Sequence, residues 1–133
     1  MFYFNDYTKA MVSDSTVASN TATYGGGGVY LYGSSDTNII NTTIFGNIAQ
    51  AILPGTYTFG GGISIGSSEA KLRLVNSTIT GNSAVVSGGG LSAQYSAKAT
   101  VVNTIISGNT ADISAQEVYV RYDAEVTSRS NIL

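Results

Sequence analysis

The eight carboxylates of this 133-residue chain are its first candidates for acid–base chemistry, because the sequence contains neither histidine nor cysteine. Two carboxyl groups about 5–9.5 Å apart, on either side of a glycosidic bond, can cleave that bond. The acidic residues are Asp6, Asp14, Asp36, Glu69, Asp112, Glu117, Asp123 and Glu125. Most of them are far apart in the sequence, so the fold decides whether two of them meet.

Tyrosine is the second residue type that suggests chemistry, with nine copies in a chain that has no tryptophan. A tyrosine ring combines a flat apolar face with a polar hydroxyl, which suits the stacking of sugar rings. The candidate ligand surface consists of Tyr30, Tyr32, Tyr57 and Tyr119. Exposed strands also favour aromatic residues by propensity alone, so a purely structural interpretation stays open.

A nine-residue motif recurs four times and indicates a repeat protein. Its copies are DSTVASNTA at 14–22, NTTIFGNIA at 41–49, NSTITGNSA at 76–84 and NTIISGNTA at 103–111. The second asparagine position recurs at an interval of about 27 residues, except that the middle interval is lengthened by the insertion AQAILPGTYTF, at about 50–59. Glycines and a short apolar alternation, such as GGGGVYLY at 25–32, follow the first three copies. The repeating unit is therefore about 27 residues long.

Each unit contains three short runs of alternating apolar residues and no helical period. The alternation points side chains such as Val29, Leu31, Ile39 and Ile44 inward. One unit cannot bury its apolar face alone, so each strand must pair in parallel with its counterpart one unit later. Parallel crossovers are right-handed. The sequence therefore predicts an all-β fold, a right-handed parallel β-helix with three strands per coil of about 27 residues.

Other repeat folds do not fit the pattern. Leucine-rich repeats need leucines at fixed spacing with a helical return, and left-handed hexapeptide helices need a period of six. The calcium-binding nonapeptide repeat needs an aspartate in register after its glycines, where this chain has VYLY or ISI. We therefore expect one β-helix domain over residues 1–133, with four to five coils, and no cofactor or metal.

Stacking of the units arranges outward residues in columns. One column of the first strand consists of Tyr3, Tyr30, Ser64, Ser92 and Tyr119, and the next of Asn5, Tyr32, Gly66, Gln94 and Arg121. No two carboxylates share these positions, which disfavours an intact glycosidase or lyase site.

Two further columns have alternative interpretations. A charged column before the second strand consists of Lys9, Asp36, Lys71 and Lys98. We interpret it as a solvated ladder, because exposed ion pairs contribute little, and an anion or uronate site is the alternative. A threonine column consists of Thr16, Thr43 and Thr78. Such a column is compatible with ice binding, but Phe45 and Ile105 interrupt it.

Asparagine recurs at two positions of the unit. The corner between the second and third strands holds Asp14, Asn41, Asn76 and Asn103, and the end of the third strand holds Asn20, Asn47, Asn82 and Asn109. Asparagine and aspartate tolerate the left-handed backbone conformation, so we expect both positions to turn the chain. Amides stacked about 4.8 Å apart can also hydrogen-bond along the stack as a ladder. These roles are structural.

The motif NSTITGNSA followed by GGGL, repeated as NTTIFGNIA with GGGI, resembles the right-handed parallel β-helix repeats of bacterial and archaeal surface or secreted proteins. It is more distantly similar to the repeats of polymorphic outer-membrane proteins. The resemblance covers nearly the whole chain and implies a pectin-lyase-like superfold. Because that group contains adhesin-like passengers and cell-wall-associated proteins, the resemblance implies an extracellular or cell-surface location within a larger precursor.

Composition limits the partners. Charged residues make up 11% of the chain and the net charge is −2, without a basic stripe, so nucleic acid is not an expected partner. The sequence has neither a signal peptide nor a run of about 18 apolar residues that would cross a membrane. It begins at a first strand and stops within a coil, so we expect a fragment of a longer solenoid whose open edges favour end-to-end self-association.

Regular faces without a catalytic cluster predict a non-catalytic structural or adhesin-like module, with glycans or other surface proteins as partners. The alternatives are a carbohydrate-binding or polysaccharide-active β-helix and, as a less favoured third interpretation, an ice-binding β-helix. The insertion carries Ile52, Leu53, Tyr57 and Phe59. Insertions in solenoids often form binding loops, so this segment is either such a loop or a flap over the adjacent coil.

Overall fold

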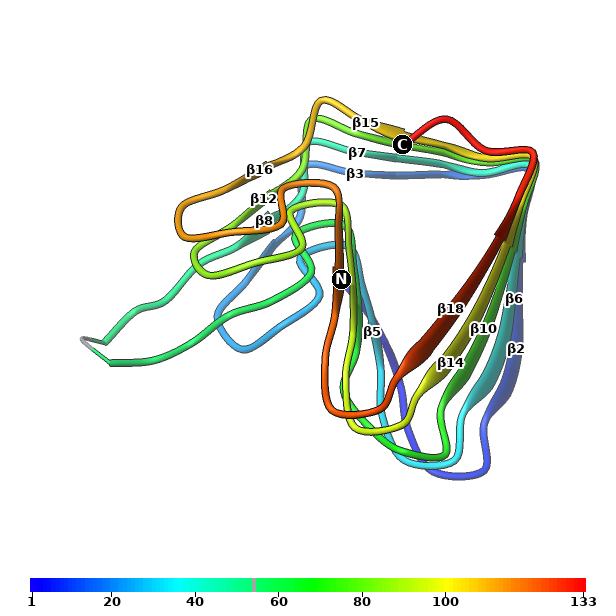
Figure 1. Cartoon of the computed structure of the whole chain (residues 1–133), viewed down its shortest axis with the longest axis horizontal. Helices are drawn as coiled ribbons and strands as arrows, with labels where there is room; N and C mark the ends of the chain where they lie inside the picture. The colour runs from blue at the N-terminus through cyan, green and yellow to red at the C-terminus, as the bar shows by residue number, and fades with distance from the viewer. Residues whose placement is uncertain (54) are drawn as a thin grey trace.

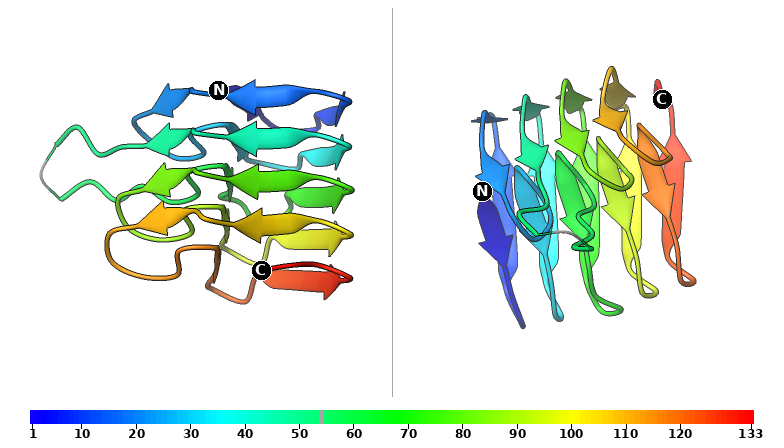
Figure 2. Two further views of the ribbon diagram at one scale, coloured as in Figure 1. Left: turned by 90° about the horizontal axis from the view of Figure 1, so that it is seen from above. Right: turned by 90° about the vertical axis from the view of Figure 1, so that its left-hand side faces the viewer.

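The computed structural model describes residues 1–53 and 55–133, and these residues form a solenoid of stacked coils. Figure 1 looks along the stack, and Figure 2 shows the coils lying one above the other. Every strand pair between coils is parallel, and the described residues contain no helix. The prediction of a parallel β-solenoid is confirmed.

Two five-stranded sheets form two sides of the stack. The first contains β1 (Phe2–Phe4), β5 (Val29–Leu31), β9 (Ile63–Ile65), β13 (Leu91–Ala93) and β17 (Val118–Val120). The second contains β2 (Lys9–Ser13), β6 (Asp36–Ile40), β10 (Lys71–Val75), β14 (Lys98–Val102) and β18 (Glu125–Arg129). We number the coils 1 to 5 by their strands of the first sheet, and each coil begins at the residue directly before that strand.

The remaining strands form two four-stranded sheets. The third sheet contains β3 (Thr16–Ala18), β7 (Thr43–Phe45), β11 (Thr78–Thr80) and β15 (Ile105–Ser107). The fourth contains β4 (Thr21–Ala22), β8 (Ile48–Ala49), β12 (Ser83–Ala84) and β16 (Thr110–Ala111). The sequence analysis expected only a column of alanines after the third strand. Two-residue strands carry too little periodicity to be recognised, although their parallel pairing is regular.

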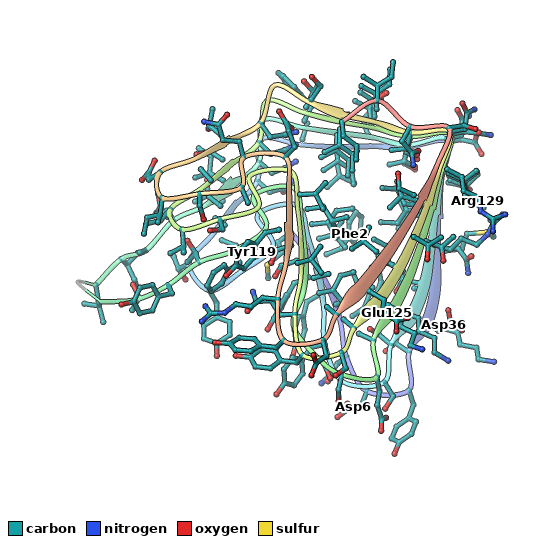
Figure 3. All side chains as sticks on the ribbon, viewed as in Figure 1. Phe2, Asp6, Asp36, Tyr119, Glu125 and Arg129 are labelled. Carbon is teal, nitrogen blue, oxygen red and sulfur yellow. The ribbon has the colours of Figure 1, made fainter. Side chains whose placement is uncertain are left out.

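The strand register follows the repeat. Val29 pairs with Phe2 and with Ile63, and Leu91 pairs with Ile63 and with Val118. Phe2 points into the space between the sheets, whereas Asp36 lies on the outer face of the second sheet (Figure 3). The inward side chains form one continuous core, in which residues such as Ile39, Ile44, Leu74 and Ile106 are fully buried.

The lengthened interval between Asn47 and Asn82 divides its extra residues between two places. Gly60 follows Asn47 by 13 positions, whereas Gly26 follows Asn20 by 6, so seven extra residues lie before β9. One more residue lies between β9 and β10, where five residues stand in place of the four between β5 and β6. The described residues on either side of position 54, at 50–53 and 55–58, project sideways from the stack (Figure 2).

The corner between the second and third sheets has left-handed backbone geometry. Asp14, Asn41, Asn76 and Asn103 all have φ between 48° and 51°. The Asn41 side chain donates to Asp14, and the Asn103 side chain donates to Asn76 over 2.8 Å. These exposed amides therefore stabilise the turn locally and bond in pairs along the stack.

The second asparagine position differs from the expected turn role. The left-handed conformation lies one residue earlier, at Ser19, Gly46, Gly81 and Gly108. The asparagines that follow form what we call the amide ladder: Asn20, Asn47, Asn82 and Asn109. The side-chain nitrogen of each of the first three asparagines donates over 2.9 Å to the side-chain oxygen of the asparagine in the next coil. The same oxygen also accepts a hydrogen bond from the backbone N–H of the donating asparagine. The ladder therefore bonds the coils to one another from inside.

The glycines before the first strand make room for the amide ladder. A Cβ built on Gly28, Gly62 or Gly90 would lie 2.9–3.1 Å from the ladder nitrogen of its own coil. The same Cβ would lie 2.7–2.8 Å from a backbone carbonyl oxygen of the next coil, which is shorter than non-bonded atoms tolerate, so the close approach requires glycine at this position.

We expect the ladder to contribute far more stability than the corner asparagines. Asn82 is fully buried, and its side chain donates to Asn109, Ile44 and Thr80. Asn82→Ala leaves buried donors and acceptors without partners, so the free energy of unfolding should fall by about 2–4 kcal/mol in urea denaturation. Asn76→Gly is the control, because glycine adopts the left-handed conformation without strain. Equal losses in the two variants would contradict the proposed importance of the ladder.

Candidate functional site

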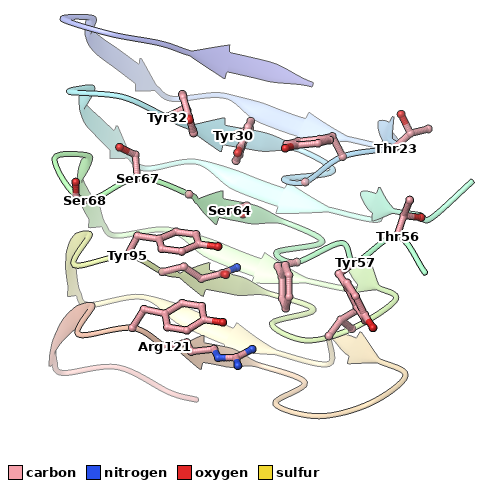
Figure 4. A pocket seen from close by; sticks show the side chains of 17 residues that line it. Thr23, Tyr30, Tyr32, Thr56, Tyr57, Ser64, Ser67, Ser68, Tyr95 and Arg121 are labelled. Carbon is pink, nitrogen blue, oxygen red and sulfur yellow. The ribbon is translucent and has the colours of Figure 1, made fainter. Parts of the chain in front are cut away.

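A hollow of about 980 Å³ lies on the outer face of the first sheet. We call it the groove. Its residues come from coils 1 to 5, so it crosses the coils instead of following one of them (Figure 4). The side loops at 23–25 and 56–59 line one margin, and the corners after β9, β13 and β17 line the other.

A cluster of tyrosines surrounds Tyr30 at the coil 2 end of the groove. Its ring centroid lies 5.5 Å from that of Tyr3, 6.2 Å from that of Tyr24 and 6.1 Å from that of Tyr32. A Cβ built on Gly66 would lie 2.7 Å from the Tyr30 hydroxyl. The missing side chain at position 66 therefore lets the ring of coil 2 lean over coil 3.

The environment of Tyr30 disfavours its ionised form. Burial raises the pKa of the Tyr30 hydroxyl from 10.0 to about 12, and the neighbouring tyrosines add to the shift. At neutral pH the hydroxyl is therefore a neutral group that can both donate and accept a hydrogen bond.

Two polar residues, Ser64 and Gln94, line the floor between the two ends. Ser64 and Ser92 occupy outward positions of the first sheet and Gln94 directly follows β13, yet all three are buried. The Gln94 amide nitrogen donates to the Ser92 hydroxyl over 3.1 Å, which fixes the orientation of the amide. The Gln94 side chain lines the groove, so its oxygen is suited to accept a hydrogen bond from a ligand.

The coil 5 end combines stacked rings with a positive charge. The rings of Tyr95 and Tyr122 stack with centroids 5.0 Å apart, and the Arg121 guanidinium lies 4.3 Å from the Tyr122 centroid. Arg121 also donates to the Tyr119 hydroxyl over 3.4 Å. Tyr119 stacks on Phe59 of the insertion, with centroids 5.6 Å apart. The cation is thus held against a ring and a hydroxyl.

Three of the four candidate tyrosines line the groove: Tyr30, Tyr32 and Tyr57. Tyr119 supports it through Phe59. The sequence analysis did not select Tyr24, Tyr95 or Tyr122 as ligand-binding residues. Tyr95 and Tyr122 could have been found from their spacing, because they stand one period of the repeat apart.

Comparison with known protein families identifies the class of this architecture. The family model described as the right-handed β-helix region matches residues 2–133 of the sequence. The chain belongs to the right-handed β-helix family. This match confirms the predicted handedness of the β-helix. No protein with a curated description and no solved structure matches the chain. Within residues 1–53 and 55–133, the chain contains no α-helix that could cross a membrane.

The charged column of the β-helix lies on a different side. The backbone register places Lys9, Asp36, Lys71 and Lys98 at equivalent positions, and Glu125 continues the column. Lys98 and Glu125 form an ion pair over 3.6 Å, and their side chains are 64% and 69% exposed. Such pairs are weak, so the column has the character of a solvated surface.

Alkaline titration should distinguish Tyr30 from the other tyrosines. The Tyr30 hydroxyl loses its proton near pH 10 in the unfolded chain and near pH 12 in the folded chain. Because the unfolded chain releases this proton first, the free energy of unfolding falls as the pH rises from 10 to 12. We expect Tyr30→Phe to lose the last phase of tyrosinate absorbance and to flatten the fall of stability above pH 10. Tyr7→Phe, which changes an exposed tyrosine, should leave that last phase in place. A late phase that persists in Tyr30→Phe would contradict the assignment.

Proposed function

We propose that this β-helix is a non-catalytic carbohydrate-binding module, and that the groove is its binding surface. The observation that carries the proposal is the joint presence of aromatic rings and fixed polar groups in one open hollow. Tyr30 lines the groove from coil 2 and Tyr122 from coil 5, and Gln94 of coil 4 lines it between them. Carbohydrates combine apolar ring faces with hydroxyl groups, so they match such a surface.

The charge of the groove supports binding without catalysis. Arg121 is the one charged residue among the described residues that line it, and no carboxylate is among them. Glycoside hydrolysis ordinarily needs two carboxyl groups across the bond that is cleaved. The lining therefore suits recognition of a glycan better than cleavage of one.

We further propose a place at the cell surface or in a secreted protein, where the module would act as an adhesin-like part of a larger protein. The repeat resembles those of surface and secreted β-helices, and long solenoids offer extended binding surfaces. Glycans at a cell surface are compatible partners for the groove.

Glycan-array binding tests the proposed function. The wild-type protein should bind a defined set of glycans, and the Tyr30→Ala/Tyr119→Ala double variant should lose about tenfold or more in affinity, equivalent to about 1.4 kcal/mol. The loss follows from removal of one ring at the groove and of the ring that supports Phe59.

Tyr7→Ala is the matched control for this experiment. Tyr7 is 87% exposed and lies outside the groove, so its removal should leave glycan affinity unchanged. Absence of glycan binding by the wild type, or equal losses in the control and the double variant, would contradict the proposal.

The insertion should matter for binding but not for folding. Deletion of residues 50–56 leaves three residues between Ala49 and Gly60, as between Ala22 and Gly26. We expect the deletion variant to keep its β-sheet circular dichroism spectrum and to lose most of its affinity for the glycan found on the array, since the margin formed by Thr56 and Tyr57 is removed or displaced. Unchanged affinity would show that the insertion is not part of the binding surface.

A further inference from the structure

The ladder amide of Asn109 donates to a carboxylate and not to another amide. Beyond Asn109, the position of the next acceptor is taken by Glu117 of coil 5. The Asn109 side-chain nitrogen donates to Glu117 Oε2 over 2.7 Å, and the Asn109 backbone N–H donates to the same oxygen over 3.4 Å. The Gly108 backbone N–H donates to Oε1 over 3.0 Å. Glu117 thus accepts three hydrogen bonds that point along the stack.

These three donors have defined acceptors in the inner coils. The backbone and side-chain N–H groups of Asn82 both donate to the Asn109 side-chain oxygen. The backbone N–H of Gly81 donates to the carbonyl of Gly108 in the following coil. The two oxygens of Glu117 therefore replace two acceptors of a following coil, a side-chain amide oxygen and a backbone carbonyl oxygen.

Glu117 also occupies a position where earlier coils have glycine. The strand pairing of Leu91 with Val118 aligns Gly90 of coil 4 with Glu117 of coil 5. A Cβ on Gly90 would lie 2.9 Å from the ladder nitrogen of Asn109, which belongs to the same coil. A coil that has a side chain at the position of Gly90 therefore has no room for an asparagine in the amide ladder.

We propose that Glu117 is the terminator of the amide ladder: its carboxylate replaces the acceptors of a following coil and excludes a ladder asparagine from coil 5. Donors at an open solenoid edge are available to any strand that stacks there, whether from the same chain or from a second copy. Glu117 accepts the hydrogen bonds of these donors, so they are no longer available to a strand that stacks on this edge.

Hydrogen exchange measured residue by residue tests the terminator. In Glu117→Ala, the backbone amides of Gly108 and Asn109 should exchange about tenfold faster or more, because their charged acceptor is gone. The amide of Asn47, whose acceptor is Asn82, should keep its protection. Asp112→Asn is the control for the loss of one nearby negative charge, and it should leave all three rates unchanged.

Glu117→Gly provides a second measurement, since it restores the glycine of the inner coils and leaves space for a small ligand. Sodium acetate should slow the exchange of Gly108 and Asn109 in this variant more than sodium chloride at equal ionic strength, because acetate supplies the missing carboxylate. If Glu117→Ala does not fold, Glu117→Gln is measured instead, and it should still accelerate Gly108 by removing one carboxylate oxygen. Unchanged exchange at Gly108 and Asn109 in the substituted protein, or equal effects of the two salts, would overturn the proposal.

Discussion

The buried amide ladder is the interaction on which the rest of the structure depends. An apolar core alone would tolerate sliding of one coil over another, because its side chains are similar in every layer. A buried amide is costly unless its donors and acceptors are satisfied, and here they are satisfied only when Asn47, Asn82 and Asn109 are in register. The ladder therefore fixes the register that the apolar residues permit.

The period of the sequence made the fold predictable. Parallel stacking requires the same residue class at the same place in each coil, so the repeat specified the core and the three longer strands. The role of the second asparagine could not be read in this way. Asn82 and Asn76 are the same residue type with similar spacing, and only the backbone geometry shows that one side chain is buried and the other exposed.

The groove depends on departures from the repeat, which is why the sequence predicted it only in part. Tyrosines in outward columns were recognisable, but the leaning of Tyr30 depends on the missing side chain at Gly66 one coil away. The contact of Phe59 with Tyr119 likewise depends on the path of the insertion. Neither contact follows from periodicity, because each joins residues at different positions of the repeat.

The arrangement of the groove across the coils sets its mechanical character. Tyr30 and Arg121 belong to coils 2 and 5, which are three strand spacings apart, about 14 Å along the stack. That distance is held by backbone hydrogen bonds between coils and by the ladder beneath them, so the two ends cannot approach each other without breaking the stack. A flexible ligand would have to adapt its own shape to this rigid template and would bear most of the entropic cost of the complex.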